Sequence, residues 1–123
     1  MKWMVGSDIH GSEFFAEKLV KAYKKEGATK LLLLGDILYH GPRNDLPLGY
    51  SPKGVIRLLN LLKRDIVCVR GNCEAEVDQM VLEFPVLTDH VILEKDDLTI
   101  YMCHGHHENN ENPPLMNKKY VLL

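Results

Sequence analysis

Apolar residues occur in short runs, and between these runs they recur at helical spacing. Residues 2–6, 30–34 and 65–69 form three such runs, and Leu31 to Leu34 is an uninterrupted stretch of leucine. Short, continuous apolar runs are typical of strands that are buried on both faces of a parallel sheet. We therefore predict three buried strands at these positions.

A helix is predicted in the segment between the first and second of these runs. Ser12 has the chemistry of an N-cap residue, because its hydroxyl can accept a hydrogen bond from a free N–H of the first turn. Phe15, Leu19 and Tyr23 then recur at helical spacing. Gly27 is a typical residue at the C-terminal end of a helix.

Two further helices are predicted. Ser51 followed by Pro52 marks the start of one, because proline is favoured at the first helical position. The apolar stripe of this helix comprises Val55, Leu59 and Leu62. The other helix is predicted over residues 74–84, where Pro85 ends it.

The pattern changes towards the C-terminus, where a β-hairpin is predicted. The expected elements are strands at 90–94 and 98–103 with a turn at 95–97, a polar loop at 109–117 and a last strand at 120–123. The fold class that follows is α/β, in a single domain over residues 1–123. It consists of a parallel βαβαβ core plus a C-terminal antiparallel hairpin.

Composition and charge exclude several classes of protein. Of the 123 residues, 46% are hydrophobic and 26% are charged, which argues against a disordered or fibrous chain. With 15 basic and 17 acidic residues, we expect no binding of nucleic-acid backbone or of a membrane surface. No run is long enough to span a membrane, the N-terminus has no signal-peptide pattern, and three cysteines make no disulfide framework. We therefore expect a cytoplasmic protein.

Residues with metal-ligand chemistry follow the predicted strands. Asp8 and His10 come after the first strand, Asp36 after the second, Asn72 after the third and His104 after the hairpin. Since ligands of parallel sheets lie beyond the carboxyl ends of the strands, we expect these side chains to converge at one edge. Carboxylate and amide oxygens suit Mn²⁺ or Mg²⁺, and imidazoles extend the choice to Zn²⁺, Fe and Ni. Asp36, at the centre of the set, is the candidate to bridge two ions.

Each of these motifs also has an ordinary structural explanation. An aspartate before a helix often caps it, Gly-Asp and Gly-Asn are frequent in turns, and a cluster of histidines at 104–107 would also suit a solvated loop. Four such motifs in order, each directly after a predicted strand, favour a metal site. Rival functions lack their motifs: His10 stands where a haloacid-dehalogenase-type phosphatase needs aspartate, and there is no Gly-x-Gly-x-x-Gly and no Cys-x-x-Cys.

Taken together, the motifs resemble those of the calcineurin-like binuclear metallophosphoesterases. The motifs that carry the resemblance are Asp8-x-His10, Gly35-Asp36, Gly71-Asn72-Cys73-Glu74 and His104-Gly105-His106. Residues 35–52 and 71–80 are closer still to the small bacterial YfcE-like phosphodiesterases. The resemblance covers essentially the whole chain and implies a four-layer α/β sandwich.

The resemblance also implies a ligand set and a reaction. In this family, the positions matching Asp8, His10 and Asp36 hold one metal, and those matching Asp36, Asn72 and His104 hold the second. It implies two divalent metal ions, for which we expect manganese, and catalytic roles for Asp36, Asn72 and His104. The implied reaction is hydrolysis of phosphodiester bonds in small substrates, by a water or hydroxide that bridges the metals and attacks phosphorus in line.

Three further residues are candidates for binding the substrate. Arg43 and Asn44 can donate to phosphate oxygens, and the alternative for Arg43 is a surface ion pair with Asp45. Cys73 stands where many relatives carry a histidine that contacts the phosphate or leaving group, and cysteine is characteristic of the YfcE-like branch. A thiol is a weak donor, so a small packing residue beside the site is the alternative for Cys73.

One motif of the family has no match. The family ends its metal set with Gly-His-x-His after a later strand, and residues 105–108 have the wrong spacing. We therefore expect a truncated domain with weakened metal binding and impaired activity. The alternative function is a catalytically degenerate relative that binds metal weakly or acts only through self-association. An uncovered strand edge also predicts a homo-oligomer.

Overall fold

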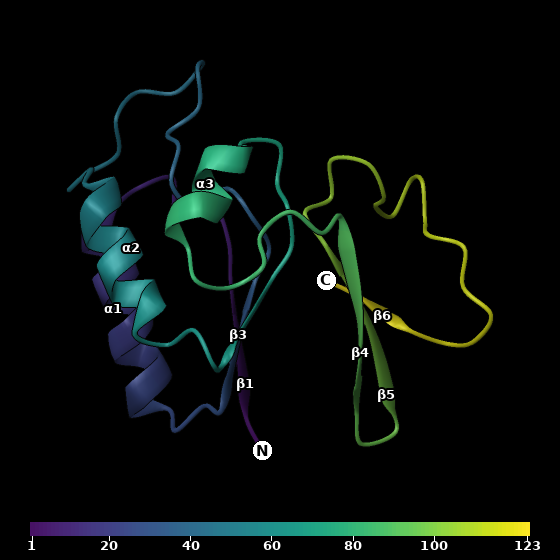
Figure 1. The fold of residues 1–123 in the computed structure, drawn as a ribbon. Coiled ribbons are helices and arrows are strands. Elements are labelled where there is room, and N and C mark those ends of the chain that lie inside the picture. The colour runs from purple at the N-terminus through teal and green to yellow at the C-terminus, as the bar shows by residue number, and fades with distance from the viewer.

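The computed structural model describes all 123 residues (Figure 1). Along the chain the elements are β1 (Trp3–Gly6), α1 (Glu13–Lys25), β2 (Lys30–Leu33), α2 (Pro52–Asn60), β3 (Ile66–Cys68), α3 (Glu76–Val81), β4 (His90–Lys95), β5 (Leu98–Cys103) and β6 (Val121–Leu122). β1, β2 and β3 pair in parallel, with Met4 opposite Leu31 and Leu31 opposite Ile66. The predicted α/β class with a parallel βαβαβ core is confirmed.

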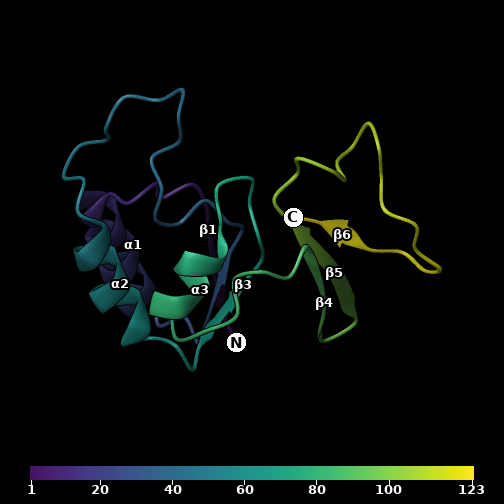
Figure 2. The ribbon, with the colours of Figure 1, turned by 45° about the horizontal axis from the view of Figure 1, so that its top comes forward.

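The elements are arranged in three layers. α1 and α2 cover one face of the parallel sheet, and the sheet of β4, β5 and β6 lies on the other (Figure 1 and Figure 2). Leu31 and Leu33 of β2 belong to the core beneath the helices, whereas Leu32 belongs to the core between the two sheets. This alternation explains the continuous apolar run, because β2 is buried on both faces. Of the four layers expected for a metallophosphoesterase sandwich, this chain builds three.

The second sheet combines both kinds of strand pairing. β4 and β5 form the predicted antiparallel hairpin, with Ile92 opposite Tyr101, and β6 adds to β5 in parallel. β4 and β6 are the edge strands, and assembly of a homo-oligomer through such an edge stays a prediction.

No helix of the chain has both the length and the apolar character that crossing a membrane would require.

The buried face of α1 is shifted by one position from the predicted pattern at two of its three residues. Ala16, Val20 and Tyr23 are buried, whereas Phe15 is 50% exposed and packs edge-to-face with Phe14 at the surface. Both stripes have helical spacing, and the small side chain at position 16 lets the helix approach its neighbours more closely than a phenylalanine would. Of the residues that recur at helical spacing, Phe15 therefore lies at the surface, whereas Tyr23 is buried.

α3 is shorter than the predicted helix over residues 74–84. The side-chain amide of Gln79 explains the early end, because it donates to two main-chain carbonyls and accepts one N–H within residues 82–86 at 2.8–3.2 Å. These bonds pair main-chain N–H and C=O groups that would otherwise need the hydrogen bonds of further helical turns. Leu82, Phe84 and Val86 then enter the core as an irregular segment.

The N-cap of α1 predicts a measurable difference between two serines. Ser12 Oγ accepts the N–H of Phe15 at 3.2 Å and donates to the carbonyl of Leu48 at 2.6 Å, whereas Ser51 Oγ accepts only the N–H of Gly54 at 3.4 Å. We expect Ser12→Ala to lower the free energy of unfolding by about 1–3 kcal/mol, because both bonds are lost in a buried position. Ser51→Ala is the matched control and should cost about 0.5–1 kcal/mol in urea denaturation. Equal losses would contradict this role of Ser12.

Candidate metal centre

A pocket of about 470 Å³ at the carboxyl ends of the strands brings together every residue predicted for the site. The predicted residues that line it are Asp8, His10, Asp36, Arg43, Asn44, Asn72, Cys73 and His104. They follow β1, β2, β3 and β5 in the chain. The structure therefore brings all the predicted side chains to one edge of the sheets, and the role of each residue stays a proposal.

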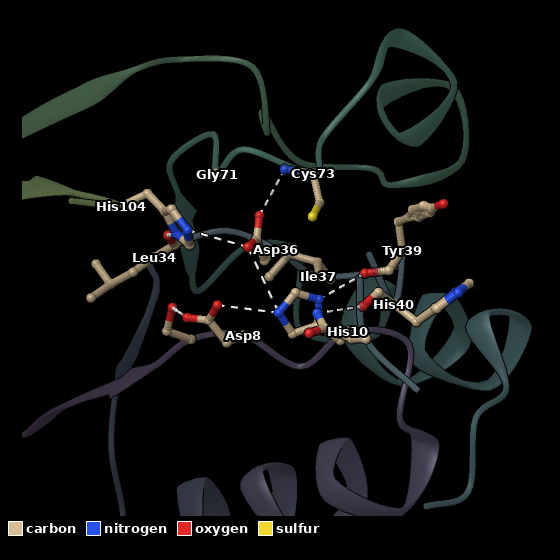
Figure 3. A network of polar contacts seen from close by, with 12 residues as sticks. Asp8, His10, Leu34, Asp36, Ile37, Tyr39, His40, Gly71, Cys73 and His104 are labelled. Carbon is tan, nitrogen blue, oxygen red and sulfur yellow. Dashed lines mark hydrogen bonds and ion pairs between the residues drawn. The ribbon is translucent and has the colours of Figure 1, made fainter. Parts of the chain in front are cut away.

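Asp36 lies at the centre of this group of side chains (Figure 3). It follows β2 and is only 3% exposed. Its Oδ1 accepts a hydrogen bond from the main-chain N–H of Cys73 at 2.9 Å. Its Oδ2 lies 3.2 Å from Nε2 of His104 and 3.7 Å from Nε2 of His10. One carboxylate oxygen is thus held by the main chain, and the other faces two imidazoles.

Main-chain carbonyls hold the two histidines in the same tautomer. Nδ1 of His10 lies 2.8 Å from the carbonyl oxygen of Tyr39, and Nδ1 of His104 lies 2.6 Å from that of Leu34. Because a carbonyl oxygen can only accept, Nδ1 carries a proton in each ring. Nε2 of each ring faces Oδ2 of Asp36 (Figure 3).

This set of acceptor atoms fits divalent cations. Nε2 of His10 also lies 3.2 Å from Oδ1 of Asp8, so two imidazole nitrogens and the oxygens of two carboxylates lie close together. Two groups of three ligand atoms, each within 4.8 Å of one another, share Asp36: one includes His10 and Cys73, and the other includes Asp8 and His104. Asp36 therefore has the position of a bridging ligand. The family resemblance implies a different grouping, with Asp8 and His10 on one ion, so the division of ligands stays a proposal.

Three of these residues adopt the left-handed backbone conformation. The angle φ is 56° at Asp8, 50° at His10 and 56° at Asp36. Few residues other than glycine adopt it, and aspartate and histidine are among the most tolerant. The loops are tied together by the N–H of Asp8 on the carbonyl of Gly35 at 3.0 Å and the N–H of His10 on that of Asp36 at 2.9 Å. These bonds fix the backbone from which the ligand-type side chains project.

The close approach of the loops after β2 and β3 requires glycine. At Gly35 φ is 99°, and a methyl group there would collide with the main-chain nitrogen of Gly71. A methyl group at Gly71 would in turn collide with Oδ1 and the main-chain nitrogen of Asp36. The two glycines therefore let the loop that carries Asn72 lie directly against Asp36.

Glu74 has no predicted role, yet its buried carboxylate joins these same loops. It is 4% exposed and accepts three main-chain hydrogen bonds, from Asp36 at 3.0 Å, Ile37 at 2.8 Å and Gly71 at 2.6 Å. Hydrogen bonds to an ionised carboxylate are strong, so three of them in a buried position hold the two loops together. The sequence gives little indication of this role, because Glu74 is only an acidic residue shortly after a glycine, at the predicted start of a helix.

The three candidate substrate-binding residues differ in what they contact. Burial, and next the Asp36 carboxylate, raises the pKa of the Cys73 thiol to about 11, so the thiol is protonated at neutral pH. The amide nitrogen of Asn44 donates to the carbonyl of His40 at 2.9 Å, which uses part of its donor capacity within the loop. Arg43 lines the pocket and forms no ion pair with Asp45.

A family model described as the calcineurin-like phosphoesterase superfamily domain matches residues 1–122. The chain belongs to this superfamily. It is 46% identical over 125 aligned residues to the protein named phosphodiesterase YfcE of Escherichia coli strain K12. That alignment covers the whole of this chain and 67% of the relative. The predicted membership, including the YfcE-like branch, is confirmed.

Similarity to solved structures supports the fold. The structure of the E. coli phosphoesterase YfcE superposes on this chain with a TM-score of 0.92 at 43% identity, covering 95% of this chain and 64% of that one. A structure described as a novel archaeal phosphodiesterase shares the fold alone, with a TM-score of 0.61 and 24% identity over 87% of this chain and 61% of that one. The chain thus spans about two thirds of the length of these relatives. Membership in this superfamily implies divalent metal ions and supports the predicted hydrolase class.

The bonds of Glu74 predict a stability difference between two glutamates. Glu74→Gln replaces one carboxylate oxygen by an NH₂ group, which leaves at least one buried main-chain N–H without an acceptor. We expect the free energy of unfolding to fall by about 1–3 kcal/mol. Glu17→Gln, at an exposed position in the middle of α1, is the control and should change it by less than about 0.5 kcal/mol. A Glu74→Gln variant as stable as the parent in urea denaturation would show that the three bonds do not hold the loops.

Proposed function

We propose that this chain is a metal-dependent phosphodiesterase that hydrolyses small phosphate diesters. The observation that carries the proposal is a buried Asp36 carboxylate whose Oδ2 faces Nε2 of His10 at 3.7 Å and Nε2 of His104 at 3.2 Å. Carboxylate oxygen and neutral imidazole nitrogen are typical ligands of divalent transition metals. The superfamily membership and the 46% identity to a protein named phosphodiesterase support the choice of reaction.

In this proposal two divalent ions share Asp36. The residues that would hold them are Asp8, His10, Asp36, Asn72 and His104. When bound, the ions would neutralise charge on the phosphoryl oxygens and acidify a water molecule. We propose Mn²⁺, because it suits the carboxylate and amide oxygens of this set. The carbonyls of Leu34 and Tyr39 would keep the imidazoles aimed at the ions, as outer partners of metal-bound histidines commonly do.

The proposed substrate is a small phosphodiester rather than a nucleic acid. Arg43 lines the pocket without an ion pair to Asp45, so its guanidinium is available for the phosphate oxygens. Asn44 and the protonated thiol of Cys73 would add weaker donors beside it. The formal net charge of −2 offers no general attraction for a polyanion. We keep the cytoplasm as the proposed location, which the three free cysteines support.

A catalytically degenerate relative is the rival function, and we do not favour it. All eight predicted site residues line one pocket, so the ligand types that metal binding needs are present together. Self-association through the edge of β4 or β6 is a separate proposal. Sedimentation at micromolar concentration tests it, and a clean monomer would contradict it.

The direct test of the proposed function combines metal analysis with an assay. The 123-residue chain is treated with EDTA and assayed on bis-p-nitrophenyl phosphate before and after Mn²⁺ is added. We expect hydrolysis only in the presence of the ion, and renewed loss with EDTA. The monoester p-nitrophenyl phosphate is the control substrate and should react more slowly. Bound Mn²⁺ without any hydrolysis would favour the degenerate relative.

The shared ligand predicts an order among three variants. Asp36→Asn should lower the affinity for Mn²⁺ by more than about 100-fold, because losing one ligand affects both ions. Asn72→Ala and His10→Ala should each cost less, because each would affect one ion. Asp45→Asn, an exposed carboxylate of the same loop, is the matched control. Metal content measured by elemental analysis decides the order, and equal occupancy in the parent chain and Asp36→Asn would refute the bridge.

A further inference from the structure

A second pocket adjoins the metal centre on the side of Asn72. Its volume is about 390 Å³, and Asn72 lines both pockets. The other residues around it are Arg70, Gly71, Asp89, His106 and His107, and none of them is apolar. They come from the loop after β3, the residue before β4 and the loop after β5. A group attached to a phosphate in the metal centre can extend over Asn72 into this second pocket.

The second pocket is lined by one basic and one acidic side chain, Arg70 and Asp89, which form no ion pair with each other. The main-chain N–H of Arg70 donates to the carbonyl of Thr88 at 2.8 Å, which places Arg70 beside the segment that leads into Asp89. The guanidinium of Arg70 donates to the main-chain carbonyl of Glu74 at 3.2 Å, and its remaining donors are free. Asp89 accepts no hydrogen bond from another side chain. The pocket therefore offers a fixed donor and a free acceptor.

Imidazole rings connect this pocket to the metal centre. The ring centroids of His104 and His106 lie 5.2 Å apart, and those of His106 and His107 lie 3.9 Å apart. Imidazoles contribute both hydrogen-bonding atoms and a flat face. A ligand that reaches from His104 along these rings would meet polar atoms throughout.

The flank of the metal centre at Asp8 and His10 has a different character. A pocket of about 460 Å³ that is lined by Asp8 and His10 is also lined by Phe15, Leu19 and Pro47. The two flanks thus distinguish an apolar substituent from a polar one. A polar substituent is better placed on the Asn72 side, because desolvating it against apolar side chains would cost free energy.

We propose that the second pocket binds one ester substituent of the diester, and that this substituent is a hydroxylated alcohol such as a glycerol or sugar unit. This inference rests on the proposed function. Hydroxyl groups both donate and accept, so they can satisfy Asp89 and Arg70 together. An anionic substituent would be repelled by Asp89, and an apolar one would leave both charges without partners.

The test uses two diesters that differ only in hydroxyl groups: glyceryl p-nitrophenyl phosphate and propyl p-nitrophenyl phosphate. In each, water adds to phosphorus and the bond to p-nitrophenolate breaks, so release of p-nitrophenolate above an enzyme-free blank reports both reactions. With Mn²⁺ present, we expect kcat/KM for the glyceryl diester to be about 10-fold higher, mainly through a lower KM. In Asp89→Ala the preference should fall below about 2-fold, because the glyceryl diester loses the acceptor for its hydroxyl groups. Asp97→Ala, in the turn between β4 and β5, is the matched control and should keep the preference.

A binding measurement separates this inference from the proposed function. Calorimetry compares glycerol 3-phosphate with propyl phosphate, and we expect tighter binding of the former in the parent chain and equal binding in Asp89→Ala. Hydrolysis of both diesters at equal rates, or a preference that survives in Asp89→Ala, would overturn the inference and leave the proposed function standing. If neither diester is hydrolysed, the proposed function fails and calorimetry alone decides the inference: equal binding of the two monoesters overturns it.

Discussion

A carboxylate that is buried as deeply as Asp36 must be surrounded by donors or cations, because removing its charge from water is costly. The main-chain N–H of Cys73 satisfies Oδ1, whereas Oδ2 faces Nε2 of two imidazoles. A metal cation held between these atoms would supply the positive charge that a buried carboxylate requires. The loops that follow four strands meet around this one side chain.

The backbone around Asp36 is built to keep that side chain in place. Gly35 and Gly71 allow two loops to touch, and the carboxylate of Glu74 then joins them through three main-chain donors. Asp8 and His10 are held in left-handed conformations by hydrogen bonds to the same loop. Such conformations are costly unless the surrounding structure holds them, and this is commonly found where side chains must be aimed at a ligand.

The strands and the residues at their ends could be predicted because both patterns are local. A continuous apolar run such as Leu31–Leu34 predicts a strand buried on two faces, and a polar residue directly after it lies at the sheet edge. Whether Phe15 or Ala16 lies on the core face of α1 could not be predicted, because both fit a helical pattern. The room between the helix and its neighbours determines which side chain is buried. The role of Glu74 depends on two donors that lie 38 and 37 residues away in the sequence, which no local pattern reports.

Anomalous diffraction from crystals of this chain grown with Mn²⁺ tests most directly whether Asp36 serves two ions. Our account predicts two anomalous peaks about 3.5–4 Å apart, as in two-metal sites, with the carboxylate of Asp36 in contact with both. Nε2 rather than Nδ1 of His10 and His104 should contact the peaks. A single peak, or two peaks of which Asp36 contacts only one, would contradict the account.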